Sequence, residues 1–187
     1  LGEGSKGGEG IPEGWRSQLS SATGAFEFTD VAPGGYAVYL GVRTPMDIVL
    51  VDSIVIARAA NLAHDVRASA GELSGRVLNQ ADRAPLHSAV VVIERERASA
   101  ECEFVAKIFS DAAGVWRAPY LADGVYRVRA YPGRGLAWAC RESLEIRNGG
   151  AIGELEFLVA AGSELELVVR DGQGAALAGV DVRLFDE

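Results

Sequence analysis

Hydrophobic and polar residues alternate along much of this chain with a period of two, the pattern of strands that bury one face. The alternation is clear at 125–131, where Tyr126 and Val128 are expected to face a core while Arg127 and Arg129 face solvent. No stretch keeps a helical period over three turns. The pattern therefore predicts an all-β chain.

The stretch 113–131 has a counterpart about ninety residues earlier, at 23–41. Each predicts a short strand, a tight turn and a longer alternating strand. The matches fall at glycines and at core positions: Gly24 with Gly114, Phe26 with Trp116, Val31 with Leu121, Gly34 with Gly124, Tyr36 with Tyr126, and Val38 with Val128. An internal repeat of this kind predicts tandem units of about ninety residues.

A second repeat relates the end of the chain to residues 71–94. Leu73, Gly75 and Val77 match Leu165, Leu167 and Val169, and the following loop is one residue shorter in the later copy, before Leu86 and Leu177 respectively. Comparison of the copies separates the faces of the next strand. The positions expected in the core are Ala89, Val91 and Ile93, matched by Val180, Val182 and Leu184; those expected outside are Val90 and Val92, matched by Asp181 and Arg183.

These repeats divide the chain into four segments. We expect a loop at 1–13, the C-terminal part of a first repeat at 14–70, a complete repeat at 71–160 and the N-terminal part of a third at 161–187. Strands are predicted near 15–21, 25–29, 35–42, 47–56 and 62–69, and in the complete unit near 72–78, 87–95, 102–110, 114–118, 125–131, 137–146 and 153–160. Seven short strands separated by turns predict a Greek-key, Ig-like β-sandwich. The partial units cannot bury both sides of a core alone, so we expect them to be distorted, frayed or complemented by other sequence.

The motifs of the complete unit resemble a known family. The order Leu73-x-Gly-x-Val77, then 84–90, 110–116 and 121–128, is similar to the carboxypeptidase regulatory-like domain. The resemblance covers nearly all of the chain after residue 14 and implies tandem transthyretin-like (prealbumin-like) sandwiches. It also implies a non-catalytic accessory or spacer module of a secreted or envelope-attached bacterial protein.

Related sandwiches include starch-binding-like carbohydrate modules and the B-type repeats of collagen adhesins. The adhesin repeats carry a Lys–Asn isopeptide bond, but the lysines of this chain are Lys6 and Lys107, and neither is on an opening strand. Self-crosslinking is therefore not expected.

Composition narrows the range of partners. Hydrophobic residues make up 49%, enough for a core, and the formal net charge of -8 argues against nucleic acid. No apolar run is long enough to insert in a membrane. The chain has neither an initiator Met nor a signal peptide, so we expect an internal piece of a longer extracellular or cell-envelope protein, with neighbouring repeats as its partners.

Candidate chemistry is sparse. His64 and His87 lack metal-ligand spacing, and His87 is expected in an exposed turn. A nucleophile elbow and a phosphate loop are absent from the sequence. Asp30 and Asp111 are better explained as turn-forming residues than as calcium ligands. No catalytic residue, cofactor or metal is therefore predicted.

The recurring residues are interpreted as structural. Tyr36 and Tyr126 each follow a turn glycine and predict tyrosine corners, with a buried ring whose hydroxyl bonds back to the turn. Gly24, Gly34, Gly114 and Gly124 are expected to supply positive φ or close backbone approach, and Trp116 a core ring. Cys102 and Cys140 leave two alternatives open, a disulfide or two free thiols.

One loop supports a ligand hypothesis. Tyr131, Arg134 and Trp138 surround a Gly-Pro segment and predict a stacking platform for sugar rings. The alternative is that Trp138 begins the next strand and packs in the core or on the neighbouring unit. The primary functional hypothesis is a non-catalytic tandem spacer with short linkers that forms a semi-rigid rod. A carbohydrate-binding module is the alternative, to be abandoned if both rings are buried, and an enzyme ranks third.

Overall fold

The computed structural model describes residues 15–44, 46–58, 62–97, 101–133, 135–163 and 166–182. Within these ranges the chain is all-β, as predicted, and no residue is helical. None of the described residues therefore belongs to a helix that could cross a membrane. The strands are β1 (Gly34–Gly41), β2 (Ile48–Ile56), β3 (Gly71–Asn79), β4 (Val90–Glu96), β5 (Cys102–Phe109), β6 (Val115–Leu121), β7 (Gly124–Tyr131), β8 (Ala139–Ile146) and β9 (Ala151–Val159).

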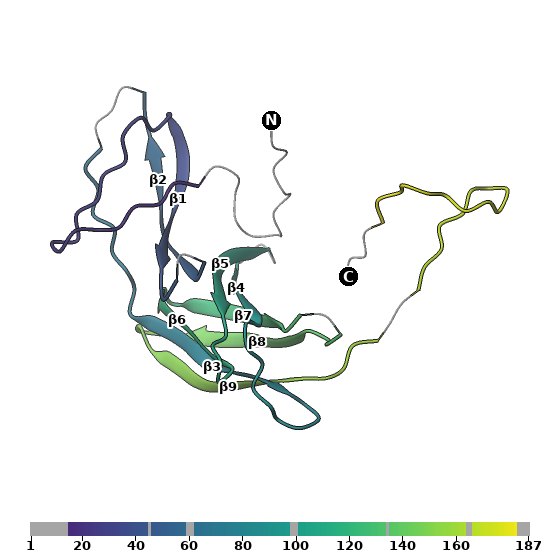
Figure 1. Cartoon of the computed structure of the whole chain (residues 1–187). Coiled ribbons are helices and arrows are strands. Elements are labelled where there is room, and N and C mark those ends of the chain that lie inside the picture. The colour runs from purple at the N-terminus through teal and green to yellow at the C-terminus, as the bar shows by residue number, and fades with distance from the viewer. Residues whose placement is uncertain are drawn as a thin grey trace.

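Strands β3 to β9 build a two-layer sandwich from the segment expected to be a complete unit (Figure 1). One layer has the order β5-β4-β7-β8, and β1 and β2 extend it beyond β5. The other layer has the order β6-β3-β9, in which β3 runs antiparallel to β6 and parallel to β9. Strand β3 lies at the centre of this layer, so β6 and β9 are joined in this sheet only through β3.

The core lies between the two layers. Ala89, Val91 and Ile93 are fully buried, as are Tyr126 and Val128, so the faces predicted for β4 and β7 are confirmed. The largest buried side chain, Trp116, packs against Phe157 with their ring centroids 6.0 Å apart. Full burial of a side chain of this size contributes roughly 1.5–3 kcal/mol, so these rings are a main source of the unit's stability.

The same turn forms at three places. The peptide N–H of Gly114 donates to the carbonyl of Asp111, and the Asp111 carboxylate accepts from the N–H groups of Ala113 and Val115. Ser21 and Gly24 make the corresponding bonds with a hydroxyl, and Asp171 and Gly174 make them with a carboxylate. All three glycines have positive φ, between 71° and 88°. A capping side chain followed by a left-handed glycine explains why these motifs recur.

The β1–β2 hairpin repeats the geometry of β7–β8. Tyr36 pairs with Ile54 on β2, and Tyr126 pairs with Leu144 on β8, in the same antiparallel register. The two hairpins nevertheless have different surroundings. Strand β7 lies between β4 and β8, whereas β1 is an edge strand that pairs with β2 alone. The hairpin is attached to the sandwich by a short pairing of Ile48 and Val49 with β5.

Three strands predicted in the N-terminal part are not formed: residues 15–21, 25–29 and 62–69 are irregular or extended without ladder pairing. The reason is the missing central strand. Residues 25–31 correspond to β6 and 62–69 to β9, and those two strands pair with β3 and not with each other. No described strand corresponds to β3 in the N-terminal part, so the backbone of both segments has no ladder to join.

The C-terminal segment 166–182 also lacks regular strands. In Figure 1 this yellow segment runs away from the two sheets. Its local bonds still repeat those of the complete unit. The N–H of Leu177 donates to Val169 over 3.0 Å, just as Leu86 donates to Val77 over 2.9 Å. Arg170 and Ala176 form the bridge that Leu78 and Pro85 form earlier. The segment is thus shaped like the opening of a repeat but has no sheet to join.

The two cysteines are not brought together. Cys102 lies on β5 and Cys140 on β8, with β4 and β7 between them, and both are free thiols. Three strand spacings amount to about 14 Å, twice the ~7 Å across which two Cα atoms can be bridged. Of the two alternatives left open by the sequence, the structure supports free thiols and opposes an intramolecular disulfide.

Candidate functional site

Tyr131 and Trp138 remain on the surface. Their side chains are 37% and 46% exposed, and their ring centroids are 6.4 Å apart with 33° between the planes. Trp138 is therefore not packed in the core formed by the described residues, and the condition for abandoning the sugar hypothesis is not met. Arg134, the third residue of the predicted platform, lies outside the described residues.

Strand pairing explains why the rings meet. Ala130 at the end of β7 pairs with Ala139 at the start of β8, so Tyr131 and Trp138 flank the opening of the loop between them. Two backbone hydrogen bonds connect this loop to the segment that follows β9. The N–H of Ala137 donates to the carbonyl of Ala160 over 3.0 Å, and that of Gly162 donates to Gly135 over 2.9 Å. The platform is thus carried by a hairpin that is tied down at its tip.

Charged side chains continue the platform across the outer face of the sheet. The Arg129 guanidinium carbon lies 5.9 Å from the centre of the Trp138 ring, a cation–π distance. Arg129 also lies 3.7 Å from a Glu94 carboxylate oxygen, which is 2.8 Å from Arg127. Burial disfavours the charged form of Arg129, but the Tyr131 hydroxyl and Glu94 outweigh burial, so the pKa of Arg129 is raised and the group stays cationic. Its Nε is buried and has no hydrogen-bond partner among the residues that the structure describes.

This cluster of Tyr131, Trp138, Arg129 and Glu94, which we call the aromatic platform, was only partly found from the sequence. The loop motif indicated the two rings, but Arg129 was interpreted only as an outward residue of its strand, and Glu94 was not singled out. The signal that could have found them is the alternation itself, since 127, 129 and 131 point to one face of β7. An exposed ring pair beside a cation and a carboxylate can stack on an apolar ring face and hydrogen-bond to hydroxyl groups at its edge.

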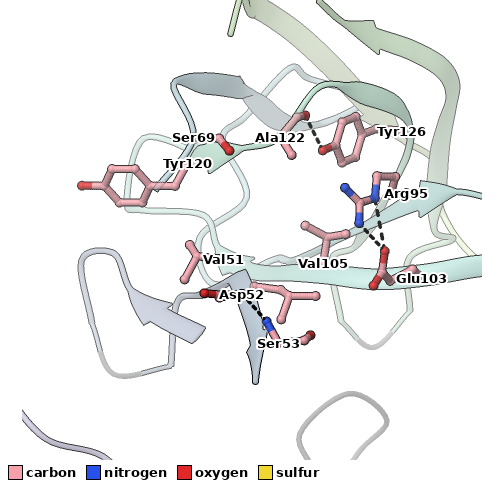
Figure 2. Close-up of a pocket in the computed structure, with 11 residues that line it drawn as sticks. Val51, Asp52, Ser53, Ser69, Arg95, Glu103, Val105, Tyr120, Ala122 and Tyr126 are labelled. Carbon is pink, nitrogen blue, oxygen red and sulfur yellow. Dashed lines mark hydrogen bonds and ion pairs between the residues drawn. The ribbon is translucent and has the colours of Figure 1, made fainter. Parts of the chain in front are cut away.

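A cavity of about 160 Å³ lies where β2 meets the complete unit (Figure 2). Its walls include Asp52 from β2 and the Arg95–Glu103 pair from β4 and β5. In Figure 2 the Arg95 guanidinium points at the Glu103 carboxylate, 2.6 Å away, and the Tyr126 hydroxyl points at the carbonyl of Ala122. Pockets for small molecules usually enclose about 300–1,000 Å³, so this cavity is small for a ligand site.

The two carboxylates at the cavity, Glu103 and Asp52, stay ionised and are already bound by basic side chains. Burial of Glu103 opposes its ionisation, but hydrogen bonds from Arg97 and Arg95 outweigh it and lower the pKa of the carboxyl. The Asp52 carboxylate accepts hydrogen bonds from His64 and from the Ser53 N–H, and these lower its pKa. A general acid or base working near neutral pH needs a pKa shifted toward 7, and both of these carboxyl groups are shifted the other way.

The structural residues lie largely as expected. Tyr126 is fully buried and its hydroxyl donates to the Ala122 carbonyl over 2.6 Å; Tyr36 makes the same bond to Ala32, also 2.6 Å, but its ring is exposed. The tyrosine-corner prediction is thus correct in full for Tyr126 and only in its hydrogen bond for Tyr36. Trp116 is buried in the core, as predicted.

The turn glycines divide into two kinds. Gly24 and Gly114 have the expected positive φ of 81° and 71°. A Cβ on Gly124 would instead meet the flexible Arg95 side chain at 3.0 Å with no positive φ, so the constraint at Gly124 is weaker than expected. Gly34 also has a positive φ, 158°, at which a side chain is strained although a Cβ would meet only the Tyr36 ring, at 3.8 Å.

The remaining candidates stay outside any cluster. His87 is exposed and bonds its neighbour Ser88, as expected for a turn residue. Asp111 caps its turn, and Asp30 lies in a left-handed conformation with φ of 54°. Within the described ranges no group of three or more His, Cys, Asp or Glu side chains could hold a metal ion.

Comparison with known proteins gives no family. No protein-family model matches the chain, and no curated protein matches it in sequence. Membership of the carboxypeptidase regulatory-like family thus stays a prediction.

Several solved structures resemble the fold. One is 5-hydroxyisourate hydrolase of Klebsiella pneumoniae, with 22% identity and a TM-score of 0.37 over 50% of this chain and 92% of that protein. Another is the pilus 2b backbone protein of group B streptococcus, with 12% identity and a TM-score of 0.36 over 71% of this chain and 53% of that one. A third is the Bacillus anthracis TIE protein, with 12% identity and a TM-score of 0.37 over 77% of this chain and 31% of that one. At these scores no likeness assigns an activity to the chain.

Proposed function

We propose that this chain is a non-catalytic structural module, a tandem β-sandwich spacer from a larger secreted or cell-envelope bacterial protein. The observation that carries the proposal is the recurrence of one backbone geometry. The turn at Asp111–Gly114 returns at Ser21–Gly24 and Asp171–Gly174 with the same hydrogen bonds. A chain built by repeating one sandwich is expected to span distance and to contact its neighbouring repeats.

The chemistry of the described residues supports a structural role. Charged groups that line the cavity are held by partners: Arg95 forms an ion pair with Glu103 at 2.6 Å, and Asp52 accepts a hydrogen bond from His64 at 2.7 Å. Those pairs link strands or loops to one another. Recurring positions such as Tyr36 and Tyr126 bond to their own turns. What the repeats preserve is thus the framework of the sandwich.

Small-angle scattering of the purified chain at low concentration tests the spacer. We expect an elongated particle whose maximum dimension exceeds that of a 187-residue globule. A compact globule would contradict the rod. Hydrolysis of ester, peptide or glycoside substrates by the purified chain, absent from a heat-denatured sample, would contradict the non-catalytic assignment.

A second candidate function, carbohydrate binding, is favoured by the exposure of the aromatic platform. Trp138 is 46% exposed and has Arg129 at 5.9 Å, so a sugar ring would find a stacking face with a hydrogen-bond donor beside it. A glycan array followed by titration calorimetry tests it. We expect Trp138→Ala to abolish binding and Trp15→Ala, which removes an exposed Trp outside the platform, to leave it unchanged. Equal loss in both variants, or no glycan bound by the parent chain, would contradict this function.

A further inference from the structure

The outer face of the larger sheet carries cations beside aromatic rings. Paired residues of neighbouring strands project to the same face of a sheet. Two adjacent rows of outward side chains, read from β5 across β4 to β7, are Lys107, Val92 and Arg129, and Phe109, Val90 and Tyr131. The Lys107 ammonium lies 5.6 Å from the centre of the Phe109 ring, and the Arg129 guanidinium lies 5.9 Å from that of Trp138. Each end of this stretch of the face therefore pairs a cation with an exposed or half-buried ring.

The carboxylates nearby do not balance these cations. The Oε2 atom of Glu94 accepts hydrogen bonds from the Nε and Nη2 of Arg127, at 3.0 and 2.8 Å. Arg129 approaches the same oxygen only to 3.7 Å, which is beyond hydrogen-bond distance. Glu142 on β8 acts on another group, since burial and this carboxylate raise the pKa of the Cys140 thiol. With the lysine of the first row included, cations outnumber carboxylates among these side chains.

Arg129 is also poorly supplied with water. Its side chain is 24% exposed, and its Nε is buried without a hydrogen-bond partner among the described residues. A neutral sugar stacked on Trp138 would cover more of this guanidinium without supplying an anion, and removing an unpaired charge from water costs free energy. A sugar that carries a carboxylate offsets that cost, because a guanidinium binds a carboxylate through charge-assisted hydrogen bonds. The charge beside the ring thus discriminates between neutral and acidic sugars.

We propose that the aromatic platform binds acidic polysaccharides, with the carboxylate of a uronate residue at Arg129 and the sugar ring stacked on Trp138. The inference rests on the carbohydrate binding proposed above and names the class of sugar. The half-buried Val90 and Val92 form an apolar floor between Arg129 and Lys107. These two cations are two strand spacings apart, about 10 Å, so a second acid group of the same polysaccharide finds a cation along the face.

The net charge of -8 does not prevent this binding. At physiological ionic strength, exposed charges further away than about 8 Å are largely screened. The charges of the face itself therefore decide which ligand it accepts.

Titration calorimetry with three uronate polymers, polygalacturonate, alginate and hyaluronate, tests the class of sugar. Each polymer is compared with its methyl ester, which keeps the sugar and removes the charge. We expect at least one polymer to bind tighter than its ester by about tenfold or more, because a hydrogen bond to a charged group contributes about 1.5–3 kcal/mol. Arg129→Gln should abolish this preference, and Arg129→Lys, which keeps the charge, should retain part of it. The matched control is Arg76→Gln, an exposed position of β3 in the other layer, which should leave the preference unchanged.

The comparison of polymer and ester needs no variant, so it decides the matter even if Arg129→Gln does not fold. Equal affinity for a polymer and its ester would overturn the inference and leave carbohydrate binding standing, as would binding of neutral glycans alone. Polyglutamate serves as an acidic polymer without sugars. If it binds as tightly as the uronates, charge alone is sufficient and the assignment to sugars is wrong. A chain that binds neither acidic nor neutral glycans would overturn the inference together with the carbohydrate-binding function.

Discussion

The carboxylate of Asp47 accepts a hydrogen bond of 2.7 Å from the backbone N–H of Phe109, 62 residues further along the chain. Asp47 is buried, and Arg43, 3.4 Å from its other oxygen, donates to the carbonyl of the same Phe109. The two side chains thus clasp both polar groups of one peptide residue at the end of β5. This clasp, with the two pairings of Ile48 and Val49, holds the N-terminal part against the sandwich.

Asp47→Ala should loosen this junction. It leaves the partly buried Phe109 N–H without its acceptor and removes the nearer of the two carboxylates beside Arg43, which is expected to cost about 1–3 kcal/mol. Chemical denaturation followed by Trp fluorescence measures the loss. Asp65→Ala, an exposed carboxylate of the same part, should change stability by less than about 0.5 kcal/mol. Equal effects of the two substitutions would contradict the role of the clasp.

Gly114→Ala should destabilise the complete unit more than Gly24→Ala. Both glycines have a left-handed φ, for which a side chain costs about 1–2 kcal/mol. A Cβ on Gly114 would in addition lie 2.6 Å from the Val77 carbonyl oxygen, whereas one on Gly24 would meet no atom within 4 Å. The melting temperatures of the two variants separate these effects, because Gly24→Ala introduces backbone strain alone and Gly114→Ala adds a steric clash. The prediction is wrong if their melting temperatures fall equally.

Tyr126→Phe should cost about 1 kcal/mol, because it removes the hydrogen bond that the hydroxyl of this buried side chain donates to the carbonyl of Ala122. Tyr36→Phe removes the same bond to Ala32 at an exposed ring and should cost less, since water replaces the lost donor. Denaturant titrations of both variants test this difference. A larger loss for Tyr36→Phe would contradict this difference in exposure between the two rings.

Acid should weaken the β4–β5 hairpin through Glu103. Its pKa is lowered in the folded protein, where bonds from Arg97 and Arg95 outweigh burial. A lowered folded pKa means that the stabilisation is present above the unfolded value of about 4.3 and is lost as the pH falls through the folded value. Unfolding free energies measured from pH 7 down to pH 3 should fall less steeply in Glu103→Gln. Parallel pH profiles of the parent and the variant would contradict the assignment.

Much of the complete unit follows from sequence pattern, because a strand's two faces alternate and repeats reveal which face is constrained. The inward positions of β4 and β7 and the bond of Tyr126 to its turn were predicted in this way. The disulfide question and the exposure of Trp138 were not decided by the pattern. The distance between the two cysteines depends on the order of strands across the sheet, and the exposure of Trp138 depends on which segment holds its loop in place. The types of residue along the chain do not reveal either.

The sequence by itself determined that the chain is all-β and which glycines and rings shape the turns at Gly24, Gly114 and Tyr126. These properties are local, since they depend on backbone geometry and on side-chain period within a few residues. Only the tertiary structure decided which predicted strands exist. Residues 25–29 and 62–69 have the pattern of strands but form none, because a strand needs a neighbour and the central strand that joins their counterparts, β3, belongs to the other unit. Ladder hydrogen bonds are made between segments, so the sequence of one segment cannot supply them.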